Sequence, residues 1–117
     1  MQAVMAAAER LEGVTAVFEM TVRGGGRQDG RLYLNSEADY RDQRCLTIAV
    51  PEEIAQELAE KLAGDPVLAL NGKTIQVAGT AKRVKIWFYS QGARTDRYYF
   101  QTHVLLTSGS QLNIKAD

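Results

Sequence analysis

Residues 71–80 read NGKTIQVAGT, and this stretch decides the fold that the sequence predicts. It opens on an Asn-Gly turn dipeptide, after which Ile75 and Val77 alternate with polar side chains. Because successive side chains of a strand point to opposite faces, the alternation predicts a strand with one buried face over Lys73–Thr80. Gly79 lies where we expect this strand to bend.

Three earlier segments alternate in the same way and predict strands, namely Val14–Val22, Arg31–Ser36 and Arg44–Val50. We expect Gly24–Gly26 to end the first strand and to open a loop that runs to the turn dipeptide Asp29-Gly30. The pattern of the third strand predicts which side chains face the core and which face outward: Leu46, Ile48 and Val50 inward, and Cys45, Thr47 and Ala49 outward.

A helix is predicted to follow the third strand. Pro51 suits its first turn, Glu52 and Glu53 suit its positive N-terminal end, and apolar residues recur at four-residue spacing from Ile54 to Leu62. The helix is expected to end at Gly64-Asp65-Pro66, because glycine and proline both interrupt helices.

The last third of the chain continues the strand pattern. Apolar residues alternate from Val84 to Phe88, a polar loop is expected at Ser90–Asp96, and a further strand is expected at Tyr98–Thr107. A short piece at Gln111–Lys115 completes the pattern.

Three strands, a helix and two strands in this order predict a mainly β fold, a five-stranded Greek-key OB-fold barrel with a helix between strands 3 and 4. A chain of 117 residues fits one domain, which we place at residues 13–117. Residues 1–12 are alanine-rich and are expected to form a short N-terminal helix, and the stretch is too short for a signal peptide or a membrane span. This favours a cytoplasmic protein, while a trimmed export signal would make it an exported one.

Composition indicates an ordinary globular domain, with 45% hydrophobic and 24% charged residues. The formal net charge is zero, which argues against the strongly basic class of nucleic-acid binders. The charge is unevenly distributed, however. Residues 1–66 hold 7 basic and 12 acidic side chains, and residues 67–117 hold 7 basic and 2 acidic ones, so a local basic face remains compatible with the total.

Several short segments together resemble a group of small bacterial OB-fold domains, whose recurring feature is a Gly-Lys-hydrophobic-x-Val-x-Gly strand. The segments that carry the resemblance are Leu32–Asn35, Asp39-Tyr40, Leu46–Ile48, Leu70–Gly79 and Ser110–Ile114. The resemblance spans roughly residues 13–115 and implies a barrel similar to the nucleic-acid-binding OB-folds of the tRNA-anticodon and helicase type. This chain departs from the group by its longer polar stretch at Ser90–Asp96 and by Cys45.

Cations and aromatic rings gather on the predicted second strand and the glycine loop beside it, and around the fourth strand and the loop that follows it. The second strand and these two loops border the ligand groove of an OB-fold. Single-stranded nucleic acid is held by cations that follow the phosphates and by rings that stack on bases. The sequence therefore predicts a non-enzymatic module that binds single-stranded DNA or RNA through nine side chains: Arg23, Arg27, Arg31, Tyr33, Lys85, Trp87, Arg94, Arg97 and Tyr99.

Other motifs favour no catalytic or metal site. Gly72-Lys73-Thr74 is not a phosphate loop, because Val67 stands where that motif requires glycine. His103 and Cys45 are the single histidine and cysteine, so they cannot build a zinc site or an internal disulfide. We expect Cys45 to be a small, largely buried thiol, and His103 to be a core or surface histidine rather than a general base.

The acidic connection with Glu37, Asp39 and Asp42 lacks the spacing of a calcium loop and is interpreted as a solvated loop. No cofactor, metal or enzymatic activity is therefore predicted. The alternative function is a protein-interaction or self-assembly module, in which the oppositely charged parts of the chain dock a protein partner or form a homo-oligomer.

Overall fold

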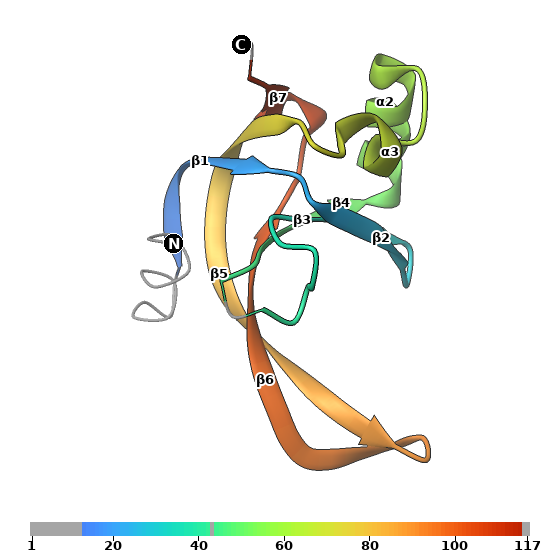
Figure 1. The fold of residues 1–117 in the computed structure, drawn as a ribbon, viewed down its shortest axis with the longest axis vertical. Coiled ribbons are helices and arrows are strands. Elements are labelled where there is room, and N and C mark those ends of the chain that lie inside the picture. The colour runs from blue at the N-terminus through green and yellow to red at the C-terminus, as the bar shows by residue number, and fades with distance from the viewer. Residues whose placement is uncertain (1–12, 43, 116–117) are drawn as a thin grey trace.

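The computed structural model describes residues 13–42 and 44–115 (Figure 1). The predicted N-terminal helix at residues 1–12 lies outside the described residues. The described part is mainly β, as the sequence predicts, and its elements are β1 (Val14–Thr21), β2 (Gly24–Gln28), β3 (Arg31–Asn35), β4 (Leu46–Pro51), α2 (Glu52–Leu62), α3 (Pro66–Leu70), β5 (Thr74–Ser90), β6 (Ala93–Leu105), the 3-10 turn η1 (Gly109–Gln111) and β7 (Leu112–Ile114).

The strands form one sheet with the order β1-β5-β6-β4-β3-β2, and β7 pairs with β5. The pairing of β4 with β6 is parallel, and the other pairs are antiparallel. Within the described residues the sheet has seven strands and is not closed, whereas the sequence predicts a five-stranded Greek-key barrel. The helix α2 does follow the third predicted strand, as expected.

The core lies between the curved sheet and α2. Alternating apolar residues of the strands point inward, and α2 covers them with Ile54, Ala55 and Leu58. The largest fully buried side chains are Leu32, Leu34, Leu46, Ile48, Leu58, Leu70, Ile75 and Leu106. None of the helices within residues 13–42 and 44–115 has both the length and the apolar character needed to cross a bilayer.

Gly24–Gly26 are part of a strand, so the prediction of a loop there is wrong. They pair with Tyr33–Asn35 as the first half of β2. Here glycine allows the backbones of β2 and β3 to approach each other closely, rather than making the segment flexible. A Cβ atom at Gly25 would collide with the carbonyl oxygen of Tyr33. The turn at Asp29-Gly30 is confirmed, and both residues have positive φ, 52° and 76°, as a two-residue hairpin turn requires.

The prediction of a polar loop at Ser90–Asp96 is also wrong. Here β5 and β6 continue into a long hairpin that turns at Gln91-Gly92, with φ of 53° and 79°. A register shift follows the turn, where the Thr95 hydroxyl donates to the carbonyl oxygen of Phe88 at 2.8 Å. In Figure 1 the hairpin projects from the body at the end opposite α2 and α3.

The outward positions predicted for β4 are buried. Cys45, Thr47 and Ala49 are 2%, 2% and 1% exposed, so β4 is covered on both faces. The reason is that side chains of the neighbouring strands close over its outer face: Tyr33 of β3 and His103 of β6 approach each other across β4, with ring centroids 6.0 Å apart. The prediction that Cys45 is a buried, small side chain is confirmed.

Candidate functional site: a groove on the outer face of the sheet

An open groove of about 650 Å³ lies on the sheet face opposite the core. Its floor comes from β3, β4 and β6, and its walls from β2, from Tyr40 and Arg41, and from the β5–β6 hairpin. The lining side chains that carry rings, charges or polar groups are Arg27, Gln28, Asp29, Tyr33, Asn35, Tyr40, Arg41, Thr47, Trp87, Phe88, Tyr89, Tyr99, Gln101 and His103.

Three side chains on one face of β6 form a directional hydrogen-bond relay along the floor. The Nε2 atom of His103 lies 2.7 Å from Oε1 of Gln101, and the Gln101 amide nitrogen donates to the Tyr99 hydroxyl oxygen at 3.1 Å. Burial raises the pKa of Tyr99, so its hydroxyl keeps its proton at neutral pH. Since that oxygen already accepts from Gln101, the hydroxyl proton is left to donate into the groove.

A second polar pair crosses the strands beside this relay. Thr47 on β4 is in register with Asn35 on β3 and with His103 on β6, so the three residues form a row across the floor. The Thr47 hydroxyl donates to Oδ1 of Asn35 at 2.8 Å, which fixes the orientation of that amide. The amide nitrogen of Asn35 has no acceptor among the described residues, so its two N–H groups remain able to donate.

Aromatic rings stand on the floor and the walls. Tyr33 lies 6.0 Å from the His103 ring between centroids, and Phe88 lies 5.2 Å from Tyr99. Two further rings are open to solvent at the rim, where Tyr40 is 51% and Tyr89 is 67% exposed. The groove therefore presents several ring faces at the spacing of neighbouring aromatic groups.

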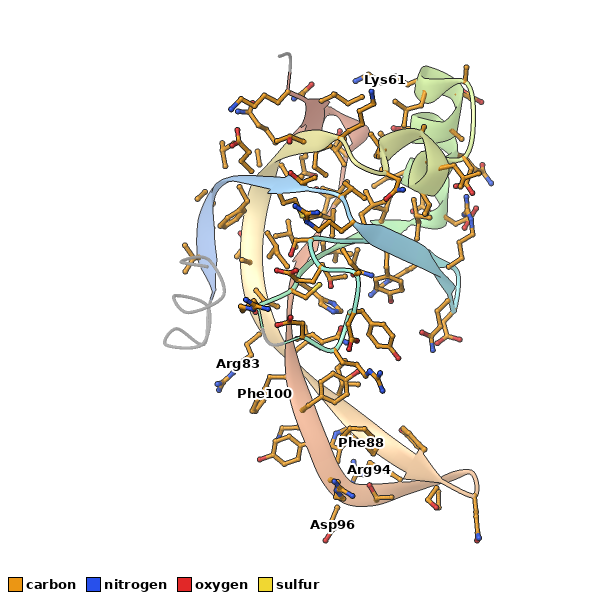
Figure 2. The ribbon with its side chains drawn as sticks, viewed as in Figure 1. Lys61, Arg83, Phe88, Arg94, Asp96 and Phe100 are labelled. Atoms are coloured by element: carbon orange, nitrogen blue, oxygen red, sulfur yellow. The ribbon has the colours of Figure 1, made fainter. Side chains whose placement is uncertain are left out.

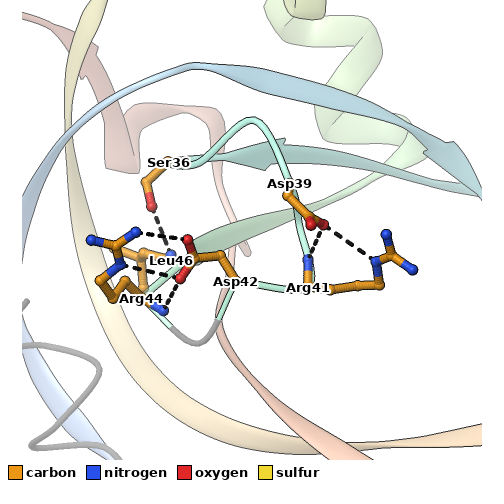
Figure 3. A network of polar contacts seen from close by, with 6 residues as sticks. All are labelled: Ser36, Asp39, Arg41, Asp42, Arg44 and Leu46. Atoms are coloured by element: carbon orange, nitrogen blue, oxygen red, sulfur yellow. Dashed lines mark hydrogen bonds and ion pairs between the residues drawn. The ribbon is translucent and has the colours of Figure 1, made fainter.

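Two local Asp–Arg pairs stabilise the connection between β3 and β4, at residues 39–42 and at Arg44 (Figure 3). Asp39 accepts from the backbone and side-chain nitrogens of Arg41 at 3.0 and 3.3 Å, and Asp42 accepts in the same way from Arg44 at 2.9 and 3.2 Å. The backbone N–H of Arg41 and then its guanidinium hold the pKa of Asp39 below its usual value. These pairs hold Arg41, and Tyr40 next to it, at the groove rim.

The same ion pairs involve Asp39 and Asp42, two of the three carboxylates considered above as calcium ligands. Asp39 and Asp42 face arginines, and within residues 13–42 and 44–115 no three potential metal-ligating side chains gather into one cluster.

Four of the nine predicted binding residues line the groove, and they are Arg27, Tyr33, Trp87 and Tyr99. Arg27 is paired with Glu52 on α2 at 3.0 Å. Two more lie close by: the Arg97 guanidinium is 5.8 Å from the Phe88 ring centre, and the charge of Arg31 acts on His103.

The other three predicted residues do not line the groove. Arg23 is exposed at the junction of β1 and β2. Lys85 and Arg94 lie on the opposite face of the β5–β6 hairpin, where both approach the Trp87 ring.

Sequence reasoning missed several lining residues, namely Asn35, Tyr40, Arg41, Thr47, Phe88, Tyr89, Gln101 and His103. One signal was available. The apolar positions of β5 change phase, from Ile75 and Val77 on the core face to Ile86 and Phe88 on the groove face. A change of phase within one strand indicates that the strand leaves the core and that its other face becomes covered.

Comparison with known proteins finds no relative of this chain, since it matches no protein-family model and no curated protein.

Proposed function

We propose that this chain is an OB-fold binding module without enzymatic activity, and that the groove holds single-stranded DNA or RNA. Support for the fold comes from β1 and β2, which are separated by Val22 and Arg23 alone. Val22 exchanges backbone hydrogen bonds with Gly72 and Lys73, and Arg23 donates to Asn35. If β1 and β2 are counted as two halves of one bent strand, that strand pairs with β5 at one end of the sheet and with β3 at the other. The arrangement then corresponds to a partly open five-stranded Greek-key barrel, to which β7 is added.

The location of the groove supports the ligand class. OB-folds bind oligonucleotides on the face of their second and third strands, between the loop after strand one and the hairpin that joins strands four and five. In this chain those elements are β3, β4, the Asp29-Gly30 turn and the β5–β6 hairpin, and all of them border the groove except Gly30.

The chemistry of the lining is the single observation that carries the proposal. Bases of any sequence stack on aromatic faces, and alanine substitution of such a ring costs about 1–3 kcal/mol per base. Tyr33, Phe88 and Tyr99 supply ring faces, while Arg27 and Arg41 stand beside them for phosphates. The Tyr99 hydroxyl and the Asn35 amide supply donors for base carbonyls or phosphate oxygens.

Modest affinity is expected, because much of the local positive charge is already compensated. Arg27 faces Glu52 at 3.0 Å, and Arg41 faces Asp39 at 3.3 Å. Stacking should therefore contribute more than phosphate contacts, which makes binding tolerant of sequence.

Fluorescence anisotropy with a labelled oligothymidylate tests this function. We expect saturable binding at about 50 mM salt that weakens toward about 200 mM, because the phosphate contacts that do form release counterions. Absence of binding at the lower salt concentration would show that the proposal is wrong.

An interaction module for a protein partner or for a second copy is the second candidate, favoured by the charge distribution. The exposed acidic side chains of α2 lie at one end of the molecule, and the cationic β5–β6 hairpin projects at the other (Figure 1). Head-to-tail association would follow from that polarity. Light scattering at low and high salt tests it, because self-association through opposite charges must decrease as salt rises.

A further inference from the structure

The β5–β6 hairpin has a second face, and of the side chains that define it only Trp87 also lines the groove. We call it the outer face and define it by Arg83, Lys85 and Trp87 on β5 and by Arg94, Tyr98 and Phe100 on β6. Cross-strand register places Lys85 opposite Phe100 and Trp87 opposite Tyr98, so these side chains project to the same side.

Cations and rings alternate along this face. The Arg83 guanidinium lies 4.1 Å from the centre of the Phe100 ring, and the Lys85 ammonium lies 4.5 Å from that of Tyr98. Arg94 lies 4.4 Å from the Trp87 ring centre. Figure 2 shows Arg83 beside Phe100 and, farther along the hairpin, Arg94.

The rings also contact each other. Trp87 and Tyr98 meet edge to face at 5.2 Å, and Tyr98 and Phe100 do so at 5.4 Å. Such pairs leave part of each ring open, and Tyr98 is 46% and Phe100 is 37% exposed.

No other strand of the described chain pairs with the outer half of the hairpin. The pairing of β5 with β1 ends at Ala81, and the pairing of β6 with β4 begins at Thr102. The ion pairs among the described residues include none of Arg83, Lys85 and Arg94. The face is therefore solvent-exposed and positively charged, with Asp96 as the single acidic residue between positions 66 and 115.

We propose that the outer face is a second contact surface for single-stranded nucleic acid, which continues the path of the strand bound in the groove. This inference rests on the proposed function. Alternating cations and rings match the alternation of phosphates and bases along a single strand. The two faces meet at Trp87, which lines the groove and also contacts Tyr98 and Arg94, so a strand that leaves the groove there reaches the outer face directly.

A membrane surface fits this face less well. The projecting tip would enter the bilayer first, and it consists of Ser90, Gln91 and Gly92, which carry no apolar side chain, while the rings lie along the two strands. Membrane-interface proteins place their aromatic side chains at the depth of the headgroups, and the tip of this hairpin has none.

The proposal predicts that affinity increases with oligonucleotide length. A strand of about five nucleotides fills the groove alone, and one of about fifteen reaches both faces, within the known range of OB-fold site sizes. We expect the longer strand to bind the unmodified protein at least tenfold more tightly than the shorter one.

The test compares both lengths on the double variant Lys85→Gln/Arg94→Gln, which removes two charges and keeps polar side chains of similar reach. We expect unchanged affinity for the short strand and a loss of about tenfold for the long one. The slope of log affinity against log salt should decrease by about 1.4 for the long strand, since each phosphate contact to a single strand contributes about 0.7.

The matched control is Lys61→Gln/Lys73→Gln, which removes the same charge away from the hairpin; Figure 2 shows Lys61 at the opposite end. Circular dichroism verifies that each variant is folded. If folding fails, Lys85→Gln alone is tested, with half the change in slope.

The outcomes separate the two proposals. If the unmodified protein binds neither strand, the proposed function itself fails. If it binds the short strand, but the hairpin variant weakens both lengths equally or neither, the inference of a second surface is wrong. Loss of sedimentation with phosphatidylserine vesicles in that variant, with oligonucleotide binding unchanged, would assign the face to a membrane and also overturn the inference.

Discussion

The Nε2 atom of His103 lies 2.7 Å from the amide oxygen of Gln101. An amide oxygen only accepts, so His103 must donate from Nε2, and its neutral form carries the proton there. This contact sets the orientation of the Gln101 amide, which in turn donates to Tyr99. The relay ends at the Tyr99 hydroxyl, which is the donor that we assign to the ligand.

Titration of His103 is the first prediction. Burial, and then the nearby charge of Arg31, lower the pKa of His103 below its usual value of about 6.5. The unfolded chain therefore binds a proton at a higher pH than the folded chain does. As pH falls from about 7 toward about 5, unfolding takes up this proton, so folded-state stability decreases over that interval.

Nuclear magnetic resonance of the imidazole checks this directly. We expect a pKa below 6.5 and an Nε2-protonated neutral form. Arg31→Gln should raise the pKa of His103, because it removes a repelling positive charge, whereas Arg31→Lys should preserve it. A pKa above 6.5 in the unmodified protein would contradict the buried relay.

Substitution of Gly79 is the second prediction. A Cβ atom at this position would lie 2.7 Å from Cγ1 of Val104, which is fully buried. We expect Gly79→Ala to lower the free energy of unfolding by about 1–3 kcal/mol, as in other overpacked cores. Urea denaturation measures the loss.

The matched control is Gly26→Ala, since a Cβ atom there meets nothing within 4 Å. It should leave stability within about 0.5 kcal/mol of the unmodified protein, as is usual for surface positions. Equal effects at both glycines would show that Val104 does not restrict Gly79.

Release of Arg27 is the third prediction. Its ion pair with Glu52 is about half exposed and contributes only about 0–1 kcal/mol to stability. Glu52→Gln should therefore preserve the fold while freeing the guanidinium at the groove wall. We expect the affinity for oligothymidylate to rise several-fold in an anisotropy titration.

Glu53→Gln is the control, because it removes the same charge from the next, exposed residue of α2. A similar gain in both variants would indicate a general charge effect rather than release of Arg27.

The sequence predicts the buried parts of this fold well. Phe18, Met20, Ile75 and Val77 follow the predicted alternation and are buried, because burial of one strand face imposes period two on the sequence. The prediction from the sequence is wrong around Gln91-Gly92, where the polar composition suggests a loop and the structure has a hairpin turn. The turn depends instead on two positive φ angles, for which glutamine gives little signal.

The site was less predictable, because it depends on contacts between distant segments. Tyr33 and His103 meet only because β4 lies parallel to β6 and antiparallel to β3. Tyr40 and Arg41 come from an irregular segment whose path is set by local Asp–Arg hydrogen bonds. The two-residue spacing of Tyr99, Gln101 and His103 predicts that they share one strand face. The groove above that face could not be predicted, because distant segments line it.

Mapping of a bound oligonucleotide tests the central claim most directly. Isotope-labelled protein is titrated at low salt with an oligothymidylate of about five nucleotides, a length that suits one OB-fold groove. The account predicts that the largest amide shifts occur at Tyr33, Asn35, Thr47, Gln101 and His103, and that Tyr99→Ala weakens binding without changing the fold. Shifts confined to α2 or β1, or no shifts at all, would contradict it.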